Sequence, residues 1–250
     1  MMLPSLVVAS IFNPLGRDFL STIKDLASGA YDKIVDFFSD DEETKPTTDD
    51  NEPIGDINNL EKDSPEEKKF MEKMKSSLNI KDISPNSTCR CRNIRLPKTK
   101  YFIVHHTAGR GTCESTMNTL NNRKNKKTGI KFSLGVQWIV DREGNLCQAL
   151  PFNSLGFHIL PSLLGPTNMN SQGVEVVGSD DNDVLPEQGI TVLKLVKKLG
   201  ISPSQIYGHG EVNPGHKAAT EGKTIKEFIQ ANYNKTGNYD FSMFKNRAPK

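Results

Sequence analysis

The stretch KYFIVHHT at residues 100–107 decides the fold of this chain. Its apolar and aromatic residues lead into a pair of histidines, which is typical of a buried strand with polar side chains at its end. Residues 135–141 (GVQWIVD), 173–177 (GVEVV) and 205–209 (QIYGH) are similarly short and apolar. These four segments predict the strands of the fold.

Helical patterns lie between and after these strands. Residues 113–125, 185–199 and 225–232 predict helices, and Gly200 ends the second of them. Strands that alternate with helices are typical of an α/β domain. We therefore predict an α/β domain over residues 85–235, followed by a C-terminal tail at 236–250.

The composition leaves room for more than this domain. The chain has 250 residues, of which 35% are hydrophobic and 25% charged, enough for one domain and an appendage. No apolar run approaches the roughly 18 residues of a membrane-spanning helix. The net charge is +2, yet residues 40–67 hold twelve acidic residues and two lysines, so the remainder is basic. A basic body suits an anionic target such as a cell wall, a membrane surface or a nucleic acid, and the charge does not choose among them.

Residues 1–38 predict a helical N-terminal segment. The apolar run at residues 3–12 has no positive charge before it, unlike a secretory signal. In residues 17–38 the apolar residues recur at steps of three and four, which indicates an amphipathic helix. Three interpretations stay open: a helix that docks on a larger assembly, a membrane-surface element, and a helix packed on its own domain.

Residues 39–84 predict an acidic, disordered linker that contains one short helix. The acidic part has too few apolar residues to bury a core. The helix begins after Ser64 as its cap, with Pro65 in the first turn and Glu67 in the capping-box position, and Phe70 and Met74 belong to its apolar stripe. We expect residues 1–84 to be dispensable for the folding and catalysis of the following domain.

The four cysteines do not form a metal-binding pattern. Cys89, Cys91, Cys113 and Cys147 lack the CxxC spacing of a zinc ribbon. Disulfides and free buried thiols both remain open for them.

The histidines are the first candidates for a functional site. All five lie between His105 and His216, and His105, His106 and His209 stand at the ends of predicted strands. Zinc needs neutral imidazoles that are held rigidly, and strand ends supply that rigidity. A metal site and a purely structural role for these histidines both fit the pattern.

Five motifs, taken in order, carry a family resemblance. They are IVHHTA at 103–108, VQWIVDREG at 136–144, GFH at 156–158, NSQGVEVVG at 170–178 and GHGEVNPGHK at 208–217. Over residues 97–232 the chain resembles the zinc-dependent N-acetylmuramoyl-L-alanine amidases, which include short phage lysins, AmpD-type amidases and peptidoglycan-recognition proteins. The resemblance implies their fold, a mixed central sheet flanked by helices, and hydrolysis of the amide between N-acetylmuramic acid and L-alanine.

The resemblance also implies a Zn²⁺ ion and two of its ligands. The first ligand of the family falls on His105 and the second on His209. The third is an Asp, Cys or His shortly after a lysine, whereas Lys217 is followed here by AATE at 218–221. Thr220 and Glu221 are the candidates, and we expect Glu221 because its carboxylate is already ionised at neutral pH.

The remaining site residues follow from the same resemblance. Glu175 would be the general base, since an isolated carboxylate on a buried strand should be paired or take part in chemistry. A carboxylate bonded to a backbone amide is the structural alternative. Lys217 would stabilise the oxyanion. His158 and Asn170 would bind the substrate, with an exposed loop position as the alternative for His158.

The predicted function is that of a peptidoglycan hydrolase, either a phage lysin or a virion-associated wall-degrading enzyme. It would be located in the phage virion or be released to the host cell wall or periplasm. A non-catalytic peptidoglycan-binding module is the first alternative, because such members of the family lack a zinc ligand. A structural virion protein that kept the fold is the second. Peptidoglycan is the expected partner, with virion or tail proteins on the N-terminal helix. Membrane contact stays open, and the absence of a basic surface interleaved with aromatic residues argues against nucleic acid.

Overall fold

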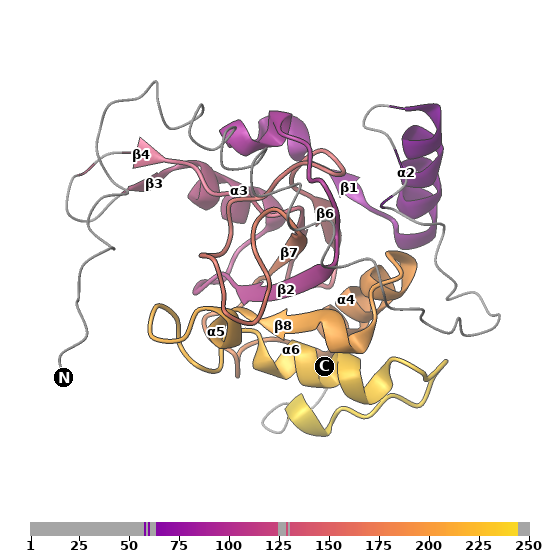
Figure 1. Ribbon diagram of the computed structural model, residues 1–250. Helices are drawn as coiled ribbons and strands as arrows, with labels where there is room; N and C mark the ends of the chain where they lie inside the picture. Colours follow the sequence, from indigo (N-terminus) through magenta and orange to yellow (C-terminus); the bar gives the residue numbers. More distant parts are fainter. Residues whose placement is uncertain (1–57, 59, 61–63, 125–128, 130, 245–250) are drawn as a thin grey trace, which may run out of the picture. The chain divides into compact units, whose positions relative to one another are not determined.

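A six-stranded mixed sheet organises the domain (Figure 1). The computed structural model describes residues 58, 60, 64–124, 129 and 131–244, all within the compact unit Thr48–Lys250. The strand order is β1-β6-β5-β7-β2-β8. The bounds are β1 Lys81–Asp82, β2 Tyr101–His106, β5 Trp138–Val140, β6 Leu146–Gln148, β7 Ser171–Val176 and β8 Ile206–Gly208. The predicted N-terminal helix lies outside the described residues.

The pairing between strands makes the sheet mixed. β5 and β6 are antiparallel, and every other pair in this sheet is parallel. A second, two-stranded sheet is formed by β3 (Arg123–Lys124) and β4 (Lys131–Phe132). The predicted α/β fold with a mixed central sheet is confirmed.

Helices cover both faces of the sheet (Figure 1). On one face, α4 (Pro186–Lys198) and α6 (Lys223–Asn232) pack on the strands, and on the other face lies α3 (Cys113–Asn121). The remaining helices are α2 (Pro65–Leu78) and α5 (His209–Val212), with 3₁₀ turns at Ser84–Asn86, Arg90–Asn93, Pro203–Gln205 and Ser242–Phe244. No helix among the described residues is long and apolar enough to cross a membrane.

The alternation of side chains along β2 separates the core from the site. Phe102 and Val104 are fully buried in the main core with α4 and α6. Because successive side chains of a strand point to opposite faces, Ile103 and His105 face the other way. The strand therefore supplies core residues on one side and a functional histidine on the other.

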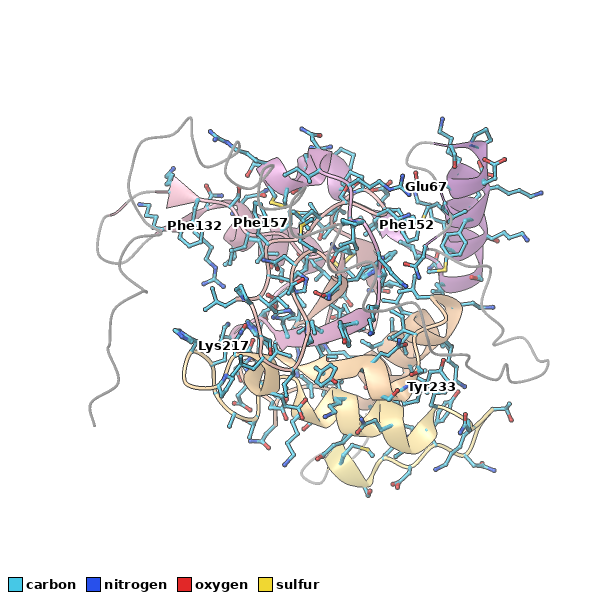
Figure 2. All side chains as sticks on the ribbon, in the orientation of Figure 1. Glu67, Phe132, Phe152, Phe157, Lys217 and Tyr233 are labelled. Carbon is cyan, nitrogen blue, oxygen red and sulfur yellow. A yellow bond between two sulfur atoms is a disulfide. The ribbon has the colours of Figure 1, made fainter. Side chains whose placement is uncertain are left out.

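Helix α2 packs on the domain. The side chain of Ser64 accepts a hydrogen bond from the backbone N–H of Glu67 at 3.1 Å, as the capping motif predicts. Phe70 and Met74 are buried in the main core, and the ring of Phe70 stacks on Phe152 with centroids 5.1 Å apart. Phe152 is labelled beside α2 in Figure 2. The apolar stripe of this helix is therefore covered by the sheet domain, which argues against its being dispensable for folding. The expectation for residues 1–84 itself stays a prediction. The domain boundaries themselves stay predictions.

The cysteines form two disulfides. Cys113, at the start of α3, is bonded to Cys147 on β6, and Cys89 is bonded to Cys91. The first bond joins elements 34 residues apart and holds α3 on the sheet. The sequence had left this choice between disulfides and thiols open.

Candidate active site

Three buried side chains converge at the ends of β2 and β8. Nδ1 of His105 lies 2.7 Å from Nδ1 of His209, which in turn lies 2.9 Å from Oε1 of Glu221. The third side of this triangle, from Nδ1 of His105 to Oε1 of Glu221, measures 3.8 Å. The exposed fractions are 2%, 6% and 5% for His105, His209 and Glu221. The structure thus brings together the three residues that the sequence singled out as metal ligands.

Strand pairing and one glycine explain this convergence. β8 pairs with β2 so that Val104 lies opposite Gly208, which places His105 and His209 side by side. Glu221 precedes Gly222, whose φ of 83° is in the left-handed region. A Cβ at Gly222 would collide with the carbonyl of Val104, so only glycine lets the chain pass this close to β2. That close passage turns Glu221 inward.

The electrostatics of the cluster suit a cation. Burial and the nearby His209 hold the pKa of His105 well below its usual value, so its imidazole stays neutral. Burial acts to raise the pKa of Glu221, but hydrogen bonds from His105 and His209 outweigh it and keep that pKa well below the usual range. The cluster therefore offers a neutral imidazole and an ionised carboxylate at neutral pH.

The donor atoms fit a metal ion in type and spacing. Tetrahedral Zn²⁺ with bonds of about 2.0–2.1 Å has its ligand atoms about 3.3 Å apart. The measured separations of 2.7, 2.9 and 3.8 Å bracket that value. Thr220, the other candidate for third ligand, has an exposed side chain, unlike the buried Glu221.

Glu175 lies next to this cluster on the neighbouring strand. It is the register partner of His105 in the parallel pair of β7 and β2. Its Oε2 atom is buried without a hydrogen-bond partner among the described residues. Burial and the negative charge of Glu221 raise the pKa of Glu175 to about 7, against the opposing charges of Lys217 and Arg123. A carboxyl group that titrates near neutrality can exchange a proton at physiological pH.

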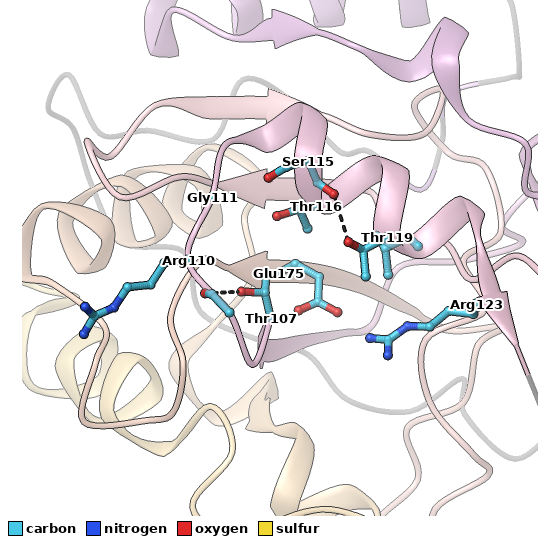
Figure 3. Close-up of a pocket in the computed structure, with 10 residues that line it drawn as sticks. Thr107, Arg110, Gly111, Ser115, Thr116, Thr119, Arg123 and Glu175 are labelled. Atoms are coloured by element: carbon cyan, nitrogen blue, oxygen red, sulfur yellow. Dashed lines mark hydrogen bonds between the residues drawn. The ribbon is translucent and has the colours of Figure 1, made fainter. Parts of the chain in front are cut away.

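A cleft opens beside Glu175. It has a volume of about 90 Å³ and is lined by Glu175, by hydroxyl side chains and by two arginines (Figure 3). Arg110 is bonded to Asp183 at 2.7 and 3.0 Å, whereas no ion pair of Arg123 is found in the described part of the chain. Glu175 thus lies in the wall of a small polar cleft.

Lys217 lies on the loop after α5 (Figure 2). Its Nζ atom is 3.3 Å from Oε1 of Glu221, and the side chain is 40% exposed. A cation is thus held at the edge of the buried cluster, partly open to a ligand.

His158 and Asn170, the predicted substrate-binding residues, occupy different places. His158 is 8% exposed, and its Nδ1 lies 3.1 Å from Nε2 of His105. Burial and the nearby His209 lower the pKa of His158 to about 3. Because the side chain is buried, the alternative of an exposed loop position for His158 is wrong. Asn170 precedes β7 at the end opposite Glu175, where its side chain accepts hydrogen bonds from Thr167. The structure does not bring Asn170 together with the cluster.

One residue near the cluster was not singled out from the sequence. Oδ1 of Asn213 lies 3.1 Å from Nε2 of His209. The available signal in the sequence was its spacing of four residues from His209, because residues i and i+4 of a helical turn share one face.

Comparison with known proteins agrees with this arrangement. A sheet domain with a buried cluster of two histidines and a carboxylate defines a candidate metal-dependent hydrolase. The family model described as N-acetylmuramoyl-L-alanine amidase matches residues 95–223. The chain belongs to this family of enzymes, as its motifs predicted.

The chain also shows similarity to several solved structures. The endolysin N-acetylmuramoyl-L-alanine amidase LysCS from Clostridium intestinale is 17% identical, with 55% of this chain and 84% of that chain covered and a TM-score of 0.41. A mutant endolysin from Bacillus subtilis is 19% identical over 61% of this chain and 99% of that one, with a TM-score of 0.45. AmpD is 16% identical over 66% and 92%, with a TM-score of 0.43. No curated protein matched the chain.

Proposed function

We propose that the chain hydrolyses the amide between the lactyl group of N-acetylmuramic acid and L-alanine in peptidoglycan, with Zn²⁺ held by His105, His209 and Glu221. The observation that carries this proposal is the convergence of these three ligand atoms beside a carboxyl group of pKa about 7. When bound, Zn²⁺ supplies a Lewis acid that polarises the scissile carbonyl and acidifies water. A site that only bound the wall would have no need of the base.

Glu175 takes the proton from the attacking water. Its buried Oε2 has no competing partner among the described residues, so it is free to accept that proton. Its pKa of about 7 leaves a large fraction ionised at neutral pH and still makes it a useful base. The proton can then pass to the leaving amine of L-alanine.

Lys217 stabilises the negative charge that develops on the carbonyl oxygen. Its ammonium group stands 3.3 Å from Glu221 at the rim of the cluster, and it is exposed enough to approach a substrate. The cleft beside Glu175 would take the muramyl peptide, with its polar lining facing the amide groups.

The biological setting is the second part of the proposal. We place the enzyme in a phage, as a lysin or a virion component that opens the host wall, acting at that wall. The segment before the domain, with its periodic apolar residues at 17–38, is the feature that suggests attachment to a larger assembly.

Product analysis on purified cell walls tests the reaction. The enzyme should release new L-alanine amino termini without new reducing sugars, and a chelator should stop the release. New reducing ends would identify a glycosidase and contradict the proposal. Binding to walls with neither product would favour the non-catalytic binding module.

A further inference from the structure

The side-chain amide of Asn213 is fixed by backbone groups. Its Oδ1 accepts a hydrogen bond from the N–H of Leu160 at 3.0 Å, and its Nδ2 donates to the carbonyls of Leu160 and Val212 at 3.0 and 2.9 Å. A flipped amide would set its oxygen against two carbonyl oxygens and its NH₂ against an N–H. Asn213 is only 4% exposed, so water does not offer an alternative to these bonds.

This fixed orientation presents an acceptor to the ring of His209. Oδ1 of Asn213 also lies 3.1 Å from Nε2 of His209, and an amide oxygen can only accept. Without a metal ion, the carboxylate of Glu221 accepts the ring proton at Nδ1. When Nδ1 gives up that proton to bind a metal ion, Nε2 carries the proton of the neutral ring and donates it to Asn213. It is Nδ1 that faces His105 and Glu221 at 2.7 and 2.9 Å.

His105 shows the same arrangement with a different partner. Its Nε2 lies 3.1 Å from Nδ1 of His158, and its own Nδ1 faces the cluster. The other nitrogen of His158 is 3.4 Å from Oγ of Ser171, whose hydroxyl donates to Thr167 at 2.6 Å. With its proton used in that bond, Oγ can accept from His158, which leaves Nδ1 of His158 to accept from His105. Both imidazoles thus present Nδ1 to the cluster.

The geometry points to Asn213 as a positioning residue that accepts a hydrogen bond from Nε2–H of His209 when Nδ1 binds a metal ion, and so holds the ring with Nδ1 toward His105 and Glu221. This inference rests on the proposed ligand set. Asn213 also links His209 to the backbone of Leu160. One side-chain amide therefore fixes the orientation of the His209 ring and the position of the segment that follows His158. Partners of this kind on metal-ligating histidines typically contribute about 10–100-fold to metal affinity.

Zn²⁺ affinity of full-length variants, measured by competition with a chromophoric chelator, gives the first test. Asn213→Ala should bind Zn²⁺ about 10–100-fold more weakly than the wild type. Asn168→Ala is the matched control. The Asn168 side chain bonds the same loop through His158 and Ile159 but has no bond to the His209 ring. Equal losses in Asn168→Ala and Asn213→Ala would assign the effect to the loop and overturn the inference, as would an unchanged affinity in Asn213→Ala.

The Nε2 proton of His209 in the Zn²⁺-loaded protein gives the second test. Nitrogen-15 NMR should show a slowly exchanging Nε2–H signal in the wild type and faster exchange of that proton in Asn213→Ala, which removes its acceptor. Equal exchange in the two proteins would overturn the inference. A wild-type protein that binds no Zn²⁺ would instead contradict the proposed ligand set.

Discussion

His105 and Glu175 are direct register partners on β2 and β7, the strands that carry the metal-ligand candidate and the candidate base. Parallel strands hold partner residues at a fixed spacing of about 4.8 Å between backbones. The relative position of the two side chains is therefore set by the paired strands and not by a loop. Catalytic groups held by rigid strands are pre-organised for reaction.

Glu175→Gln should separate chemistry from metal binding. Glutamine keeps the size of the side chain but cannot take a proton, so kcat should fall by about 10²–10⁴-fold while bound Zn²⁺ is retained. Kinetics on a soluble muramyl peptide and metal analysis of the same sample check both parts. Glu227→Gln, on the exposed surface of α6, is the control and should leave kcat unchanged. A Glu175→Gln enzyme of near wild-type rate would show that another group is the base.

The pH profile should follow the ionisation of Glu175. A base works only when deprotonated, so kcat/KM should rise as the pH passes upward through about 7, the pKa of Glu175. The positive charge of Arg123 lowers this pKa, and Arg123→Gln should therefore move the rising limb to higher pH. Arg110→Gln, which lines the same cleft but is paired with Asp183, should leave the limb in place. A shift to lower pH in Arg123→Gln is the result that would speak against this assignment.

The ligand variants should lose metal in a defined order. His105→Ala and His209→Ala should each abolish Zn²⁺ binding, because each removes one of the three converging atoms. Glu221→Ala should weaken binding strongly, while Thr220→Ala should have little effect since its side chain is exposed. Isothermal titration with Zn²⁺ compares the four proteins. Equal affinities for Glu221→Ala and Thr220→Ala would remove Glu221 from the ligand set.

Helix α2 should contribute to the stability of the whole domain. Met74 is fully buried in the main core, and a Met→Ala change in such a position costs about 2–5 kcal/mol. Urea unfolding of Met74→Ala should show this loss in the single transition of the domain. Lys73→Ala, on the exposed side of the same helix, should change the free energy of unfolding by less than about 0.5 kcal/mol. An unchanged midpoint for Met74→Ala would mean that α2 unfolds separately.

The sequence predicted the strands and helices whose residues show a local apolar pattern. The apolar segments that became β2, β5, β7 and β8 are buried strands, and a buried strand shows itself by composition alone. β1 and β6 were not predicted, because β1 consists of two charged, exposed residues and β6 (LCQ) has only one large aliphatic residue. The apolar stripe of α2 was recognised in the sequence, but such a stripe does not identify the residues that pack against it.

The site residues also include some that local sequence patterns predicted and some that they did not. The motifs pointed to His105, His209 and Glu175, which stand at strand ends or on a buried strand. The position of Glu221 depends on the left-handed Gly222, which a sequence permits but does not impose. The role of Asn213 depends on Leu160, 53 residues away, and no local pattern carries a contact of that range.

Mass spectrometry of a soluble muramyl-L-alanyl peptide, incubated with the chelated and the Zn²⁺-restored full-length protein, tests the proposed zinc-dependent hydrolysis. We expect no product from the chelated protein, and free muramic acid with an intact L-alanyl peptide once Zn²⁺ is restored. Cleavage at the same bond by the chelated protein, or an uncleaved substrate with Zn²⁺ bound to the protein, would contradict it.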